Sequence, residues 1–202
     1  MRKRLLSILL LCCMVLTLLP TAALAAGDVA INDTNFPDEI FRKYVEDGFD
    51  TNNDGFLSAG KIAAVKSIGP TDKNILSLKG VEHFTNLESL HILGLENLTL
   101  LHISENTALT SVHCERTKLT SLDTSQNEKL VYLRCENNPS LTTLDVSKNT
   151  KLKELYCGDN ALTALDLTHN LALEQFDCVG NEFTILDLSK NTELRNHWSS
   201  TL

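Results

Sequence analysis

The sequence is short of basic residues, with 18 Lys and Arg against 26 Asp and Glu. Three of the basic residues, at positions 2–4, precede an apolar run at 5–19 and the small residues Ala23-x-Ala25. This arrangement is typical of a secretory signal peptide over residues 1–25. Its removal would leave 15 basic residues against the same 26 acidic ones. Such an acidic chain is a poor partner for nucleic acid or anionic lipid.

Long apolar segments and catalytic motifs are scarce as well. After residue 25, no apolar run approaches the roughly 20 residues that a transmembrane helix needs. The sequence has no His-Glu-x-x-His, no Gly-x-Ser-x-Gly and no glycine-rich phosphate loop, and its carboxylates recur in a pattern that does not indicate a pocket. We therefore expect a secreted or extracellular protein, at a cell surface, that is not an enzyme.

A leucine pattern repeats every 21 or 22 residues through most of the chain. Each unit contains two half-motifs, Lxx[LVF]x[CI] and LxxLD[LVT], with His102 in place of the aspartate in the first unit. A sixth unit breaks off after its start at Leu194, and the five full units begin at Leu87, Leu109, Leu130, Leu152 and Leu173. Such a period predicts a solenoid, in which each coil packs on its neighbours.

The unit repeats because a single coil cannot fold alone. Apolar residues two positions apart face the same side of an extended strand, so each half-motif predicts one short strand. The asparagine that follows is expected to turn the chain, because its side chain bonds turn backbone and it tolerates unusual dihedral angles. One coil buries too little apolar surface to offset the entropy of ordering it, so stacking must supply the difference.

The segment "LKELYCGDNAL" (Leu152–Leu162) carries the pattern LxxLxLxxNxL and resembles the leucine-rich repeat. The nested form of this repeat is similar to that of secreted and surface proteins of bacteria, and "ILSLKGVEHFTNLESL" (Ile75–Leu90) is similar to the repeats of internalin-type proteins. The resemblance implies a mostly β, α/β-repeat solenoid of parallel short strands over residues 74–202, with a small helical cap at 26–73. It also implies adhesion or host interaction.

Four cysteines follow the expected signal peptide, and their spacings of 21, 22 and 21 residues are those of the repeat: Cys114, Cys135, Cys157 and Cys178. We expect a buried column of thiols in which each Cys acts as a small hydrophobe. Disulfides and a zinc site are alternatives, but stacked parallel strands give poor disulfide geometry and a straight ladder does not converge on a tetrahedron. Cys114 and His113 cannot form a catalytic pair, because neighbours on a strand point to opposite faces.

The outward residues of the first strand of each coil are the candidate binding surface. Solenoids bind ligands on such sheets, and Tyr and Arg are frequent interface anchors, so Tyr132, Arg134 and Tyr156 are the expected centre. The predicted ligand-binding face comprises His91, His113, Tyr132, Arg134, Glu154, Tyr156 and Asp177. Its expected partner is a protein or glycan at a cell surface. The alternatives are a solvated face without a partner and a metal held by the two histidines.

The second half-motif places four aspartates in one outward column: Asp123, Asp145, Asp166 and Asp187. Stacked like charges repel, so each carboxylate needs compensation. We expect each Asp to bond its own turn, where Ser or Thr follows two residues later. Neighbouring lysines or weakly bound cations are the alternatives.

The predicted cap contains a segment that resembles an EF-hand loop between two helices, the second of them at Ile62–Ile68. Lys61 stands at the twelfth position, where a bidentate acid should complete the calcium shell. Two interpretations remain: the loop is a weakened calcium site, or it is a relic that only seals the first coil. The ligands of the first alternative are Asp50, Asn52, Asp54, the Phe56 carbonyl and Ser58.

The sixth unit, "LRNHWSSTL", has His197 where an inward leucine belongs. The sequence is compatible with a fragment of a longer protein, with Trp198 and Leu202 folding over the last coil, or with self-association through that end. The leading function is a secreted, non-catalytic binding module. The alternative is an accessory or truncated segment of a larger secreted protein or enzyme.

Overall fold

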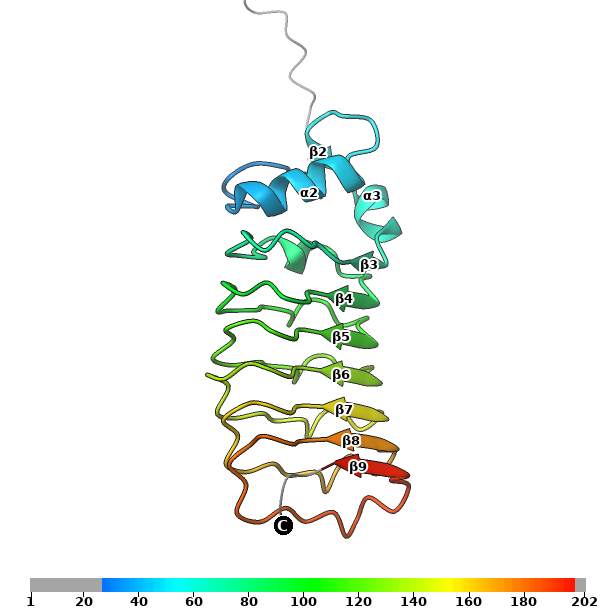
Figure 1. Ribbon diagram of the computed structural model, residues 1–202. Helices are drawn as coiled ribbons and strands as arrows, with labels where there is room; N and C mark the ends of the chain where they lie inside the picture. Colours follow the sequence, from blue (N-terminus) through cyan, green and yellow to red (C-terminus); the bar gives the residue numbers. More distant parts are fainter. Residues whose placement is uncertain (1–26, 199–202) are drawn as a thin grey trace, which may run out of the picture.

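The computed structural model describes residues 27–198, which form a stack of coils with a small helical cap at its N-terminal end (Figure 1). The expected signal peptide and Leu202 lie outside the described residues. Within residues 27–198, no helix is long and apolar enough to span a membrane. The elements are β1 (Val29–Ala30), α2 (Glu39–Phe49), β2 (Phe56–Leu57), α3 (Ala59–Ala64), β3 (Ser67–Ile68), the 3-10 helix η1 (Val81–His83), β4 (Ser89–His91), β5 (Ser111–His113), β6 (Tyr132–Arg134), β7 (Glu154–Tyr156), β8 (Gln175–Asp177) and β9 (Asn196–Trp198).

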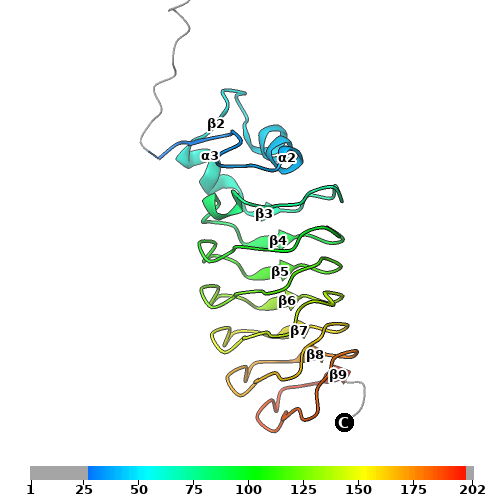
Figure 2. The ribbon, with the colours of Figure 1, turned by 90° about the vertical axis from the view of Figure 1, so that its left-hand side faces the viewer.

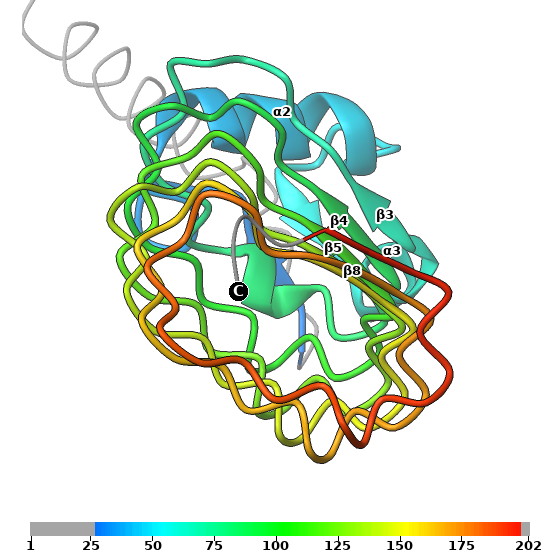
Figure 3. The same ribbon diagram turned by 60° about the horizontal axis from the view of Figure 1, so that its bottom comes forward.

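One seven-stranded parallel sheet runs the length of the stack in the order β3 to β9 (Figures 1 and 2). The coils lie over one another in the tilted view, with the strands on one side (Figure 3). The central residue of each strand from β4 to β8 is buried, because the leucine spacing points it inward. The mostly β, parallel leucine-rich-repeat solenoid predicted from the sequence is confirmed.

The second predicted strand of each coil does not form in the described chain. In this segment the structure has an isolated parallel bridge between Asp123 and Asp145. Backbone amides of this segment bond side chains instead, as where the Leu119 amide donates to Asn138 Oδ1 (3.2 Å) and the Ser125 amide donates to Asp123 Oδ1 (2.9 Å). Amides that are used in this way cannot join a strand ladder.

Two short helices and a two-stranded hairpin make up the cap, and β1 pairs antiparallel with β2. Helix α2 begins where Asp38 accepts hydrogen bonds from the amides of Ile40 (3.0 Å) and Phe41 (2.9 Å). The prediction of a helix at Ile62–Ile68 was wrong in its position. Ser58 caps α3 at its start, and the chain leaves helical geometry at Val65. The parallel sheet therefore begins with β3, within the segment assigned to the cap.

Buried asparagines join neighbouring coils on both sides of the core. At the corners that follow the second half-motif, each side-chain amide donates to two backbone carbonyls of the preceding coil; these residues are Asn106, Asn127, Asn149, Asn170 and Asn191. A second ladder follows the cysteines and consists of Asn138, Asn160 and Asn181. The sequence predicted turn bonds, whereas the structure shows bonds between coils as well. The unusual dihedral angles fall one residue earlier, at Arg116, Asn137 and Asp159, where φ is 52° to 57°.

Candidate binding surface

The strand register brings the outward side chains of β4–β8 into two straight columns on one face. The first residue of each strand forms a column of Ser89, Ser111, Tyr132, Glu154 and Gln175. The third residue forms a column of His91, His113, Arg134, Tyr156 and Asp177. All seven residues of the predicted ligand-binding face lie in these columns, and their binding role remains a prediction.

Four aromatic rings form a continuous ladder, with three of them in the column of third residues and Tyr132 in the column of first residues. The rings of His91 and His113 meet edge to face, with centroids 4.4 Å apart. His113 stacks on Tyr132 at 4.6 Å with planes 16° apart, and Tyr132 contacts Tyr156 at 5.6 Å. Neighbouring aromatic pairs stabilise one another, so this aromatic ladder (His91, His113, Tyr132 and Tyr156) is a preformed surface with little freedom to lose on binding.

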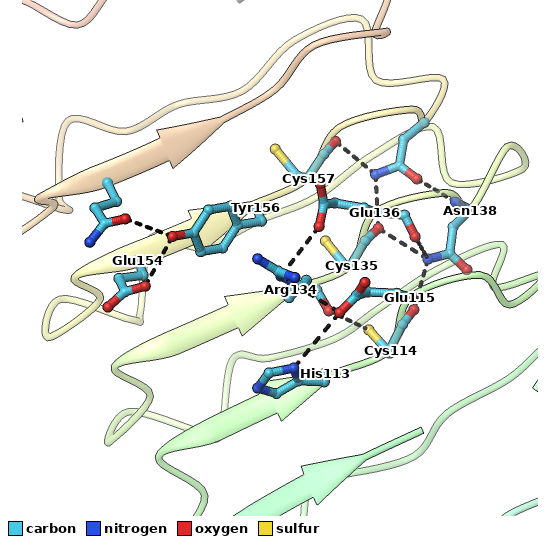
Figure 4. Close-up of polar contacts among 12 residues, drawn as sticks. His113, Cys114, Glu115, Arg134, Cys135, Glu136, Asn138, Glu154, Tyr156 and Cys157 are labelled. Atoms are coloured by element: carbon cyan, nitrogen blue, oxygen red, sulfur yellow. Dashed lines mark hydrogen bonds and ion pairs between the residues drawn. The ribbon is translucent and has the colours of Figure 1, made fainter. Parts of the chain in front are cut away.

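Arg134 is held within the face and does not extend freely from it. Its guanidinium lies over the Tyr156 ring, 4.5 Å from the centroid, which is a cation–π contact. Its Nε lies 3.3 Å from Glu136 Oε2 and 3.6 Å from Glu115 Oε1 (Figure 4). Packing and two ion pairs therefore fix Arg134, which the sequence predicted only as an interface anchor.

The sequence argument missed two functional candidates, the carboxylates of Glu115 and Glu136. They are mostly covered, at 16% and 20% exposure, and each follows a cysteine of the buried column. Burial raises the pKa of Glu136 above its usual value, although Arg134 opposes the shift. The repeated Cys-Glu pair at 114–115 and 135–136 could have indicated these residues in the sequence, because two acids one coil apart repel each other and require a cation near them.

Tyr156 connects the ladder to its acidic edge. Its hydroxyl lies 3.0 Å from Glu154 Oε2, to which it donates, and 2.8 Å from Gln175 Oε1 (Figure 4). Burial and the neighbouring carboxylate raise the pKa of Tyr156 to about 12, so the hydroxyl stays protonated. Asp177 is engaged by its own turn, because its Oδ1 accepts a hydrogen bond from the Val179 amide (3.0 Å).

The charge of this face is predominantly negative. Burial, with help from His91 and Arg134, lowers the pKa of His113, so its ring is neutral at pH 7. Arg134 shares the face with four carboxylates: Glu115, Glu136, Glu154 and Asp177. In residues 27–198, no group of three or more His, Cys, Asp and Glu side chains has the arrangement of a metal site. The histidine pair therefore gains no third ligand there.

The four cysteines are buried and free, as predicted. Figure 4 shows three of them, Cys114, Cys135 and Cys157, one per coil. Burial raises the pKa of Cys135 to about 12 and that of Cys178 to about 11, and it also raises the pKa values of Cys114 and Cys157 well above the usual one. A thiolate is the reactive form, so these groups serve packing and not chemistry.

The aspartate column also follows the predicted pattern. Each carboxylate accepts the backbone amide two residues later at 2.8 to 2.9 Å, the acceptors being Asp123, Asp145, Asp166 and Asp187. These amide bonds lower the pKa of every member of the column. Asp123 and Asp145 line a shallow depression of about 310 Å³ together with Lys148.

The EF-hand-like loop brings four of its five predicted ligands together around Lys61. Its Nζ lies 2.5 Å from Asp50 Oδ1, 2.9 Å from Asp54 Oδ1 and 2.7 Å from the Phe56 carbonyl oxygen. It also donates to Asn52 Oδ1. Ser58 does not join them, because its Oγ accepts the Lys61 amide (3.3 Å) at the start of α3.

Comparison with known proteins places this chain among bacterial leucine-rich-repeat structures. It matches the functional domain of InlJ from Listeria monocytogenes, described as including a cysteine ladder, with 31% identity and a TM-score of 0.59 over 87% of this chain and 44% of that one. A leucine-rich-repeat protein of Leptospira interrogans matches 69% of this chain and 45% of its own length, with 20% identity and a TM-score of 0.51. The chain thus spans less than half of either protein's length. No family model and no curated protein matches it.

Proposed function

We propose that this internalin-like leucine-rich-repeat solenoid is a secreted, non-catalytic module that binds a protein at a bacterial or host cell surface. The observation that carries the proposal is the aromatic ladder (His91, His113, Tyr132 and Tyr156), whose contacts of 4.4 to 5.6 Å cross four strands. A flat sheet of this kind offers contact area to a partner. The likeness to the InlJ domain supports an interaction role.

The charges around the ladder favour a basic partner. Glu154 and Asp177 lie at its β7–β8 end, while Glu115 and Glu136 flank Arg134 and outnumber its single charge. Arginine and lysine side chains of a partner would meet carboxylates at the rim and aromatic rings at the centre, which is the usual anatomy of an interface. We therefore expect a partner segment rich in Lys and Arg with apolar anchors.

A random peptide library displayed on phage tests this function, with the purified chain as bait. We expect enrichment of peptides rich in Lys and Arg, whose binding weakens as salt rises. The variant Tyr132→Ala/Arg134→Ala/Tyr156→Ala should lose capture of the enriched pool. A matched control is Gln126→Ala/Lys129→Ala/Thr150→Ala, which changes three exposed residues outside the strands and also removes one positive charge.

The same baits on a glycan array separate the two partner classes. Glycan capture through Tyr132 and Tyr156, without enrichment of any peptide, would replace the protein proposal with a lectin-like one. Equal capture of the peptide pool by the wild type and the face variant, or no enrichment at all, contradicts the proposed face.

A further inference from the structure

A lysine ammonium occupies the position where the EF-hand-like loop (residues 50–61) would hold calcium. Its Nζ contacts one oxygen each from Asp50, Asn52, Asp54 and the Phe56 backbone. These are the first, third, fifth and seventh loop positions, which supply calcium ligands in an EF-hand. The side chain is 11% exposed, so the charge is enclosed by the loop.

The loop cannot hold this ammonium and a calcium ion together. Calcium takes six to eight oxygen ligands at about 2.3–2.6 Å, and the four available oxygens already lie around Lys61 Nζ. The twelfth position, which normally adds two carboxylate oxygens, provides the competing cation. Ser58, the ninth, is used to cap α3. The residues present therefore fit a cation but do not fit calcium.

We propose that Lys61 is the built-in cation of this loop, so that the cap folds and docks on the first coil without calcium. A tethered ammonium does not depend on the calcium concentration, and it forms ion pairs with two carboxylates of the loop at any calcium level. Asp50 needs this ammonium most, because its side chain is 1% exposed and its buried charge would otherwise have no cation beside it.

The surrounding bonds support this role. Asp50 Oδ2 accepts the Gly55 amide (2.8 Å), and Asp54 Oδ1 accepts the Phe56 amide (3.0 Å), which fixes the loop around the ammonium. Burial by itself would lower the pKa of Lys61, but its hydrogen bonds to Asp50 and Asp54 outweigh burial and raise it. The bond from Lys61 is the main cause that lowers the pKa of Asp54 to about 2.

Restoring the acid at the twelfth position tests the proposal. By calorimetry with calcium chloride, the wild type should show no binding at 1 mM or below, and its melting temperature should be the same in calcium and in EDTA. Lys61→Glu should bind calcium with a Kd on the order of 10⁻³ M or tighter, and calcium should raise its melting temperature. Lys66→Glu is the matched control, because Lys66 is 52% exposed and pairs with Glu88 outside the loop; it should not gain calcium binding.

A second measurement needs no variant. Brief acetylation followed by mass spectrometry should modify Lys66 and Lys43 readily and Lys61 at least several-fold more slowly, with no change when calcium is added. Calcium binding by the wild type with faster labelling of Lys61 would overturn the proposal. So would a folded Lys61→Glu variant that does not bind calcium, and if that variant does not fold even in calcium, the wild-type labelling and titration decide.

Discussion

Asn149 donates its side-chain amide to the backbone carbonyl of Asn127, 3.0 Å away in the preceding coil. The same amide reaches the Thr124 carbonyl (3.1 Å), and the Asn149 oxygen accepts the Thr124 hydroxyl (2.7 Å). Asn149 is fully buried, so these bonds replace water for three polar groups of the neighbouring coil. The equivalent asparagines repeat the two amide bonds along the stack, so polar bonds as well as apolar packing join its coils.

Replacement of that asparagine should weaken the stack. Asn149→Ala removes three buried hydrogen bonds between coils, although each of the three partner groups keeps one other hydrogen bond. We therefore expect a loss of about 1–3 kcal/mol in the free energy of unfolding. Urea denaturation followed by circular dichroism measures it. The control is Gln126, an exposed residue next to Asn127 in the preceding coil, and Gln126→Ala should change stability by less than about 0.5 kcal/mol. Equal effects of the two substitutions would contradict a structural role for the buried amide.

The aspartate column allows the turn bond to be separated from the charge. Asp145→Asn keeps an oxygen acceptor for the Ser147 amide but removes the charge, whose ionised form the fold favours because its pKa is lowered, so we expect a small loss of stability. Asp145→Ala removes the acceptor and should cost about 1 kcal/mol. Thermal melts at low and high salt compare them. A larger loss in the Asn variant than in the Ala variant would show that the charge itself is needed.

The buried thiols should be protected from reagents in the native protein. Because burial raises the pKa of Cys135 to about 12, alkylation by iodoacetamide at pH 8 should leave all four cysteines of the column unmodified until the chain unfolds. Mass-spectrometric mapping with and without denaturant identifies the modified positions. Disulfide-linked peptides, or rapid native labelling of Cys114, Cys135 or Cys157, would refute simple packing. Cys135→Ser should destabilise by about 1–3 kcal/mol, because it buries a more polar group.

The lowered pKa of His113 makes stability depend on pH. The ring faces His91, Tyr132 and Arg134, and its Nδ1 lies 3.8 Å from Glu115. The folded pKa lies below the ordinary 6.5, so the unfolded chain takes up the proton first as pH falls. The neutral ring therefore contributes fully to the free energy of unfolding above pH 6.5. This contribution is lost as the pH falls towards the lower pKa of His113 in the folded state.

Urea denaturation at pH 7.5 and pH 5.0 should therefore show a loss of stability in the wild type that is smaller in His113→Gln. The raised pKa of Glu136 has the opposite effect, because it makes the folded state more stable as the pH falls. Glu136 is present in both proteins, so the comparison between them removes its contribution to the pH dependence. The matched control is His169→Gln, which removes an exposed histidine outside the sheet face. Identical profiles for His113→Gln and the wild type would refute the assignment.

Much of this architecture could be predicted from local spacing. The leucine period predicted the coils, the cysteine spacing predicted a buried free column, and Asp145 with Ser147 two residues later predicted the turn bond. Each of these features depends on residues within one coil, or on the same position in the next. A repeating sequence fixes such relationships, because each coil must present the same inward side chains to its neighbours.

The tertiary structure decided which groups from different positions meet. The Lys61 ammonium reaches Asp50 eleven residues away, and Arg134 Nε faces Glu115 from another coil as well as Glu136 of its own. The second half-motif makes only an isolated bridge, because side-chain oxygens accept backbone amides such as those of Leu119 and Ser125. These outcomes depend on side-chain direction and distance across the stack, whereas the period constrains only which face a residue occupies.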